Sequence, residues 1–111
     1  MNSSVQAPHI SQMRVAANEA TTVLRTLANE DRLLLLCQLS QGEMSVSELE
    51  SALDIRQPTL SQQLGVLRTE GLVQTRRDGK RIFYSVSDPK VLTMLGVLYE
   101  LYCPKDEGES S

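Results

Sequence analysis

One segment constrains the fold of this chain more than any other: PTLSQQLGVLRTEG, which carries the start, the buried face and the end of one short helix. Pro58 suits the first position of a helix, because its missing N–H would have no partner there in any case. Gly71 stands where a helix closes with a left-handed residue. One face of this helix is apolar and is expected to be buried: Leu60, Leu64 and Leu67.

The opposite face of the helix is polar and centres on Gln62. Upstream, Ser45 and Glu48 have the spacing of a capping box, which opens a second short amphipathic helix. Residues 54–57 form a tight turn between the two. This arrangement predicts a helix-turn-helix, in which hydrogen-bonding side chains on the second helix read DNA bases. The candidate DNA contacts on this helix and its turn are Gln57, Thr59, Ser61, Gln62, Gln63 and Arg68.

A basic hairpin is predicted directly after this helix. Residues 72–77 and 81–86 are rich in strand-forming types, and Asp78-Gly79 between them is a strong hairpin signal. A hairpin in this position is typical of a winged helix-turn-helix, where the wing meets phosphates or the minor groove. Cations cluster around the tip of the predicted wing and complete the candidate DNA contacts: Arg76, Arg77, Lys80 and Arg81.

The distribution of charge favours a nucleic-acid-binding face, although the total charge does not. The chain has a formal net charge of -3 and a pI near 5.1. The segment from Arg56 to Arg81 nevertheless has six cations and two acids, a local balance of +4, which leaves -7 for the rest of the chain. A basic segment on an acidic body attracts a polyanion to one face. A merely solvated charged surface is the alternative interpretation.

Three further helices are predicted around this unit. An apolar stripe with small alanines runs along residues 13–27 and serves either core packing or a dimer surface. Residues 30–41 follow a capping Asn29 and are apolar on almost every side, which predicts a buried helix that also buries Cys37 as an inert thiol. A last amphipathic helix starts at Pro89.

The predicted fold class is α+β, mainly α: a winged helix-turn-helix flanked by an N-terminal and a C-terminal helix. One domain at residues 12–103 accounts for nearly the whole chain, with a flexible N-terminal tail at 1–11 and a flexible acidic tail at 104–111. A chain of 111 residues buries only a modest core, so its stability is expected to depend on a partner subunit.

Compartment and function class follow from what the sequence lacks. No stretch approaches the roughly 18 apolar residues of a membrane span, and no signal-peptide pattern opens the chain. Two cysteines are too few for a disulfide framework, so a cytoplasmic protein with reduced thiols is expected. The only histidine, His9, lies in the N-terminal tail, and no phosphate-binding glycine loop is present. A DNA-binding regulator is therefore favoured over a winged-helix module for protein contacts and over an enzyme.

The chain resembles the ArsR family of bacterial repressors over roughly residues 15–103. The resemblance is carried by the order of the predicted elements and by the strings LANEDRL, QPTLSQQL and EGLV. It implies a homodimer, paired through its first and last helices, that represses promoters by binding an inverted repeat in double-stranded DNA until an inducer acts. Metal-sensing relatives carry clustered cysteines on the first helix of the helix-turn-helix, or histidines and carboxylates on the last helix. Neither pattern is found here, so no metal or other cofactor is expected.

The recognition-helix string and the cysteine pair are most similar to the persulfide-sensing branch of this family, which includes BigR, SqrR and HlyU. The resemblance places Cys37 on the second helix and Cys103 at the end of the last. It implies that reactive sulfur species join the two thiols, directly or through inserted sulfur atoms, and so weaken DNA binding. The residues themselves do not predict activated thiols, because Cys37 lies among leucines and Cys103 at the negative end of a helix. There are alternatives on three points. The inducer could be another oxidant or a metal, the targets could be virulence or stress genes, and the protein could act by anti-repression in place of repression.

Overall fold

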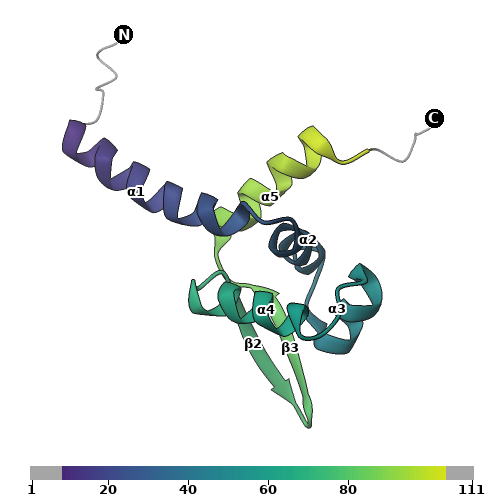
Figure 1. The fold of residues 1–111 in the computed structure, drawn as a ribbon. Helices are drawn as coiled ribbons and strands as arrows, with labels where there is room; N and C mark the ends of the chain where they lie inside the picture. The colour runs from purple at the N-terminus through teal and green to yellow at the C-terminus, as the bar shows by residue number, and fades with distance from the viewer. Residues whose placement is uncertain (1–8, 105–111) are drawn as a thin grey trace.

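The computed structural model describes residues 9–104 and has a mainly helical α+β fold (Figure 1). The predicted fold class, a winged helix-turn-helix, is confirmed: α3 and α4 form the helix-turn-helix, and β2 and β3 form the wing. The helices are α1 (Ile10–Leu27), α2 (Glu30–Leu39), α3 (Val46–Leu53), α4 (Thr59–Thr69) and α5 (Pro89–Tyr102). The strands are β1 (Met44–Ser45), β2 (Val73–Asp78) and β3 (Arg81–Val86).

The predicted tails fall largely outside the described residues, at positions 1–8 and 105–111. Helix α1 begins two positions before the predicted start of the domain. The reason is local: the backbone N–H of His9 donates a hydrogen bond of 3.1 Å to Oε1 of Gln12, which gives the helix a defined first turn.

The core lies where α2, α3 and α4 meet, with contributions from α5 and the strands. Leu35 and Leu36 of α2 are completely buried, as is Leu49 of α3. Helix α2 is less fully enclosed than its sequence predicts, because Leu34 is 41% exposed. The buried apolar set is Leu27, Leu35, Leu36, Leu39, Leu49, Ile55, Leu60, Leu64, Leu67, Leu72, Val73, Val91 and Leu95.

The predicted helix caps are confirmed. Asn29 Oδ1 accepts from the N–H of Arg32 at 3.0 Å, and Ser45 exchanges both bonds of a capping box with Glu48, at 2.8 and 3.3 Å. Gly71 has a φ of +78°, the left-handed conformation expected after α4. The sequence placed Pro58 at the first helical position of α4. In the structure Pro58 is the N-cap, one residue earlier, and the helix begins at Thr59.

The three strands form an antiparallel sheet in the order β1-β3-β2. The predicted hairpin is present, but its two-residue turn consists of Gly79-Lys80, because Asp78 already pairs with Arg81 in the ladder. Gly79 has a φ of +65°, which suits glycine as the first central residue of a tight hairpin turn. The shift by one residue puts Lys80 at the tip of the wing.

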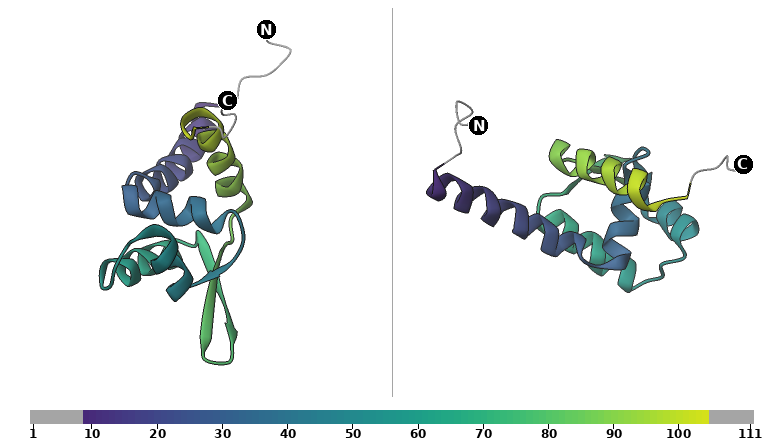
Figure 2. Two further views of the ribbon diagram at one scale, coloured as in Figure 1. Left: turned by 90° about the vertical axis from the view of Figure 1, so that its right-hand side faces the viewer. Right: turned by 90° about the horizontal axis from the view of Figure 1, so that it is seen from above.

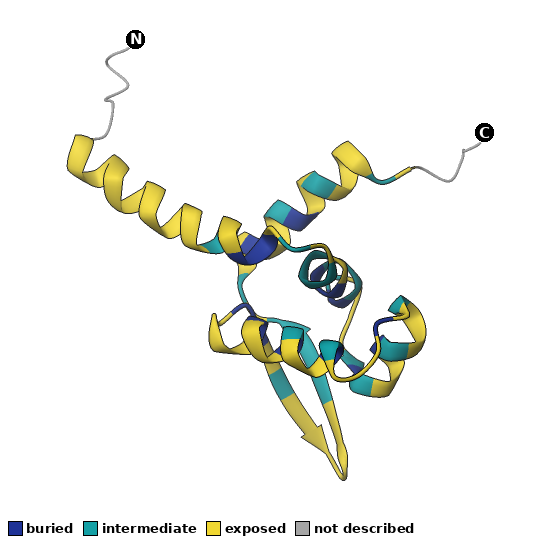
Figure 3. Cartoon of the chain, viewed as in Figure 1, coloured by how far each residue is buried: buried dark blue, intermediate teal, exposed yellow. Residues whose placement is uncertain are grey.

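Helix α1 projects away from the rest of the chain, as Figure 1 and the right-hand view of Figure 2 show. Every residue from 10 to 22 is exposed, and the helix is exposed along nearly its whole length in Figure 3. The radius of gyration is 17.1 Å, whereas a compact chain of this length would have about 13 Å. The apolar stripe of α1 therefore meets the core of its own chain only at its C-terminal end, through Leu27, which is 6% exposed. No helix within residues 9–104 is long and apolar enough to cross a bilayer.

Candidate nucleic-acid interface

Helix α4 is anchored by one face and presents the other to solvent. Its three leucines, at positions 60, 64 and 67, are buried. The outer side of the helix is exposed in Figure 3. The exposed residues of the predicted recognition face are Ser61, Gln62 and Arg68, while Thr59 is half-buried. Gln62 makes no side-chain hydrogen bond to any residue between 9 and 104, so its amide is available for a ligand.

The start of α4 is capped by a side chain from the preceding turn. Gln57 Oε1 accepts hydrogen bonds from the backbone N–H of Ser61 at 3.1 Å and from its hydroxyl at 2.6 Å. The backbone bond satisfies an N–H in the first turn, where helices leave donors without an intrahelical partner. Gln57 and Ser61 were both predicted to contact DNA, and in the free protein they bind each other.

Gln63 occupies a different environment from its neighbour Gln62. It is half-buried, and its Oε1 accepts a hydrogen bond of 3.0 Å from Nη1 of Arg32 on α2. The sequence grouped Gln63 with the outward-facing residues because it belongs to the same polar string. The helical rotation of about 100° per residue turns Gln63 toward the body.

Two of the four wing cations are held by acidic residues of the neighbouring segment. Arg76 Nε donates to both carboxylate oxygens of Glu43 at 3.1 Å. Arg81 Nη2 lies 3.5 Å from Glu48 Oε2 and 3.0 Å from Ser45 Oγ. Both guanidinium groups also lie over one ring of the wing, that of Phe83, at 4.8 and 4.9 Å from its centroid.

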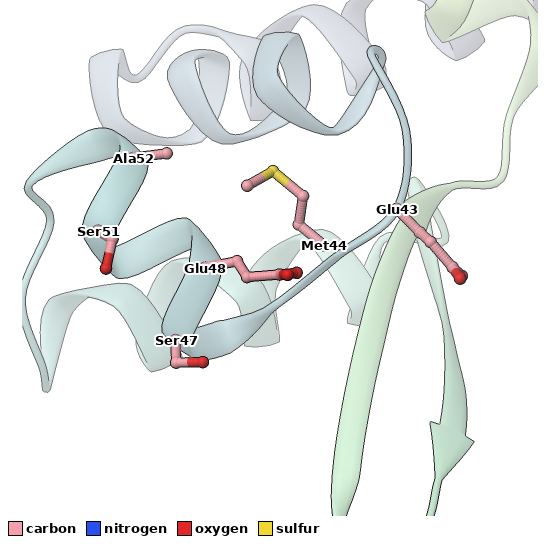
Figure 4. Close-up of a pocket in the computed structure, with 6 residues that line it drawn as sticks. All are labelled: Glu43, Met44, Ser47, Glu48, Ser51 and Ala52. Carbon is pink, nitrogen blue, oxygen red and sulfur yellow. The ribbon is translucent and has the colours of Figure 1, made fainter.

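The two acids line a shallow hollow of about 550 Å³ between β1 and α3. In Figure 4, Glu43 points away from the other lining residues. The hydrogen bond from Arg76 lowers the pKa of Glu43. The pKa of Glu48 is lowered first by the backbone N–H of Ser45 and further by the charge of Arg81. Both acids are therefore ionised at neutral pH. We call the two ion pairs, Arg76–Glu43 and Arg81–Glu48, the carboxylate clamp.

Arg77 and Lys80 lie outside the carboxylate clamp. Neither side chain makes a hydrogen bond or ion pair with another residue in the described part of the chain, and both residues are exposed. Arg77 pairs across the ladder with Ile82, whereas Arg76 pairs with Phe83, so the two neighbouring arginines point to opposite faces of the hairpin. The four cations that the sequence treats alike thus form two classes.

The two cysteines belong to α2 and to the end of α5, two helices that contact each other. Cys37 lies on α2, Cys103 is the C-cap of α5, and both are half-buried free thiols. Burial raises the pKa of Cys37, and the charge of the Cys103 thiolate raises it further. A hollow of about 260 Å³ between α2 and α5 is lined by Cys37 together with Leu95 and Gly96. Cys37 is therefore less enclosed than its leucine-rich context predicts.

No three His, Cys, Asp or Glu side chains within residues 9–104 lie close enough together to hold a metal ion. His9 is exposed at the start of α1.

Comparisons with known proteins agree with this geometry. A family model described as "Bacterial regulatory protein, arsR family" matches residues 29–75. The "Biofilm growth-associated repressor" of Agrobacterium fabrum is 53% identical over 95 residues, which cover 86% of this chain and 81% of that protein. The chain belongs to the ArsR family. It is a transcriptional regulator of that family, not an enzyme.

Two further relatives connect this ArsR-family chain to the branch that its sequence resembles. "Transcriptional activator HlyU" of Vibrio cholerae is 39% identical over 99 residues, covering 89% of this chain and 92% of that protein. The structure of reduced HlyU has a TM-score of 0.81 at 41% identity and covers 85% of this chain and 99% of that one. The crystal structure of the transcriptional repressor BigR from Xylella fastidiosa has a TM-score of 0.79 at 48% identity, covering 84% and 95%.

Sequence reasoning missed several residues that surround the site. Glu43 clamps a wing arginine 33 positions away, and Arg32 bonds to a residue 31 positions away. Glu48 was recognised only as a capping residue, and Phe83 only as a strand former. The one signal available was cross-strand pairing, which aligns Phe83 with Arg76 once the hairpin register is known.

Proposed function

We propose that this ArsR-family regulator is a homodimeric repressor whose binding to operator DNA weakens when Cys37 and Cys103 react with persulfides or other reactive sulfur species. One observation carries the proposal: α2, which carries Cys37, contacts α5, which ends at Cys103, although 66 positions separate the two residues. The two free thiols thus belong to a core helix and to the end of an outer helix, and a bridge between them would link the two helices.

In this proposal the DNA-binding surface consists of the outer face of α4 and the wing. Gln62 reads a base edge, since a glutamine amide pairs bidentately with adenine, and Thr59 and Ser61 serve as adaptable partners. Arg68, Arg77 and Lys80 neutralise phosphates. The support is geometric: these side chains are exposed or half-exposed on adjoining elements, and α4 is rigidly seated by its three buried leucines.

The proposed dimer uses the two outer helices. Apolar side chains on α1 and α5 remain exposed in the single chain: Ile10, Met13, Val15 and Leu24 on α1, and Leu92, Val97, Tyr99, Leu101 and Tyr102 on α5. A soluble monomer rarely exposes so much contiguous apolar surface, and a second copy of the chain would bury it. The dimer presents two recognition helices to successive major grooves, roughly 34 Å apart.

The proposed switch begins with transfer of a sulfane sulfur. The Cys37 thiolate attacks the outer sulfur of a persulfide RSSH, the S–S bond of the persulfide breaks, and a thiol RSH leaves. A second persulfide lengthens the chain by another sulfur. The Cys103 thiolate then attacks the central sulfur and displaces hydrosulfide, which leaves one inserted sulfur between the two cysteines. The overall reaction converts two thiols and two persulfides into a trisulfide, two RSH and H₂S.

The half-buried setting of the thiols supports an inserted sulfur. Cys37 has a raised pKa, so little thiolate exists at neutral pH, and this thiolate is the nucleophile toward a persulfide and toward peroxide alike. Selectivity for persulfides therefore rests on the sulfur atom that only a persulfide can insert between the two cysteines. The hollow beside Cys37 offers space for an added sulfur atom. Bridging α2 to the end of α5 would shift α5 against the body, and a small rotation then moves the two recognition helices out of register with the grooves.

The experiment measures operator affinity and intact mass before and after treatment with glutathione persulfide. The operator is the inverted-repeat duplex that the wild-type protein enriches from a randomised library. Wild-type protein should release this duplex and gain sulfur with loss of two hydrogens. Cys37→Ser and Cys103→Ser proteins should bind it normally and stay bound after treatment. A Cys103→Ser protein that still releases DNA would refute the paired-thiol switch.

Two further arms separate the alternative inducers. Hydrogen peroxide at the same concentration should leave the wild-type protein on the duplex, and zinc should not change its affinity. Release by peroxide with formation of a direct disulfide would identify a general oxidant sensor. Release by zinc that survives both cysteine substitutions would identify a metal-responsive regulator.

A further inference from the structure

A single side chain on α2 joins the first helix to the recognition helix. Arg32 Nε donates a hydrogen bond of 2.7 Å to the backbone oxygen of Thr26, in the last turn of α1. Its Nη1 donates a hydrogen bond of 3.0 Å to Oε1 of Gln63 on α4. The backbone N–H of Arg32 is itself held by the side chain of Asn29 at 3.0 Å. One residue therefore ties three helices together.

Each of the two guanidinium hydrogen bonds satisfies an acceptor that would otherwise lack a donor among residues 9–104. The carbonyl of Thr26 is among the last four of α1, which have no intrahelical N–H partner, and Thr26 is only 7% exposed. A cation is also favourable at the negative end of a helix. Gln63 lies between the buried and the exposed faces of α4, where its amide oxygen would otherwise lack a protein donor. The guanidinium satisfies both acceptors at once.

The geometry of the guanidinium turns two contacts into one angular restraint. Its planar fork holds Nε and Nη1 in a fixed relation, so the Thr26 carbonyl and the Gln63 amide are fixed relative to each other. Other links between α1 and the recognition helix pass through apolar packing, which tolerates small rotations better than directed hydrogen bonds do. Within the described residues, Arg32 is the directed polar link between α1 and α4.

We propose that Arg32 is a positioning residue for DNA recognition, and that Gln63 is its partner and not a reader of bases. Together they set the angle of α4 relative to α1. The inference rests on the proposed function, in which α1 helps to hold the dimer and α4 enters the major groove. The angle between the two helices then controls how the paired recognition helices meet successive grooves. Arg32 acts through Gln63 and does not touch DNA.

The test compares affinity for the library-enriched duplex with affinity for a random-sequence duplex of equal length, across a range of salt concentrations. The variants are Arg32→Ala, Arg32→Lys, Gln63→Ala and the double alanine variant. Arg25→Ala is the matched control, because Arg25 is an exposed cation in the last turn of α1 with no hydrogen bond or ion pair to residues 9–104. Melting temperature and oligomeric state are measured alongside.

We expect Arg32→Ala and Gln63→Ala each to weaken binding to the enriched duplex about three- to tenfold, the range of one lost hydrogen bond. Binding to the random duplex and its salt dependence should not change, because no phosphate contact is lost. The double variant should be no worse than either single one, since the two residues act as one unit. Arg32→Lys should restore only part of the loss, because one ammonium cannot span both acceptors.

Several results would overturn the inference. A salt dependence flattened in Arg32→Ala by about 1.8, or about 0.9 for each subunit of the proposed dimer, would place the guanidinium on a phosphate. A loss in Gln63→Ala without one in Arg32→Ala, or losses that add in the double variant, would make Gln63 a DNA contact in its own right. If the Arg32→Ala protein has a lowered melting temperature, Gln63→Ala still tests the inference, because this variant keeps the hydrogen bond from Arg32 to the Thr26 carbonyl. Wild-type protein that enriches no duplex would instead refute the proposed function itself.

Discussion

Alanine substitution of the wing cations should separate them into two classes. The side chains of Arg77 and Lys80 have no hydrogen-bond or ion-pair partner among residues 9–104, so each can bind a phosphate without breaking such a contact. Arg76 and Arg81 must first exchange the carboxylates of the clamp for phosphates. We therefore expect Arg77→Ala and Lys80→Ala to flatten the salt dependence of DNA binding, and Arg76→Ala and Arg81→Ala to flatten it much less.

The magnitude follows from counterion release. Each phosphate contact contributes about 0.9 to the slope of log affinity against log salt concentration. In the proposed dimer one substitution removes a contact from each wing, so the slope should fall by about 1.8. When salt is raised from 50 to 200 mM, the fold loss of affinity should then be about twelve times smaller for the Arg77→Ala protein than for the wild type. This difference is well within the reach of a binding titration.

Fluorescence anisotropy of a labelled random-sequence duplex, titrated at several salt concentrations, measures these slopes directly. Lys90→Ala is the control, because Lys90 is an exposed cation at the start of α5, away from the tip of the wing. Equal slopes for all four wing variants would refute the division into two classes. Unchanged slopes for Arg77→Ala and Lys80→Ala would show that the wing does not reach the DNA backbone.

Three further predictions follow from individual side chains. Gln62→Ala should lose about 1–3 kcal/mol of discrimination between the enriched and the random duplex, whereas equal weakening on both would make Gln62 a positioning contact only. Leu64→Ala, at 1% exposure, should lower the free energy of unfolding by about 2–5 kcal/mol in urea denaturation, and Val66→Ala on the exposed side should change it by less than about 1 kcal/mol. The rate of Cys37 alkylation by iodoacetamide should keep rising with pH above the point at which an ordinary thiol has ionised, because burial and the Cys103 charge raise the pKa of Cys37. Cys103→Ser should shift this pH–rate profile to lower pH. A profile that is the same in Cys103→Ser and in the wild type would show that the two thiols do not interact.

Local features of this fold could be predicted because each depends on residues within a few positions of one another. The capping box joins Ser45 to Glu48 within one turn. The buried face of α4 consists of leucines spaced three and four positions apart. The hairpin needs only two strand-forming runs and a glycine between them. Where such predictions missed, as at Pro58 and at the Gly79-Lys80 turn, the error was one residue, because neighbouring positions satisfy almost the same local rule.

The tertiary structure alone decided how the functional side chains are partnered. Gln62 and Gln63 are identical in sequence terms, yet one faces solvent and the other binds Arg32. Arg76 and Arg77 differ only in the face of the hairpin to which the pleat turns them, and that face decides whether Glu43 can reach the guanidinium. These partners lie more than 30 positions apart, so no periodicity or motif encodes them; they meet because the packing of α1, α2 and α4 and the register of the sheet set the distances between them.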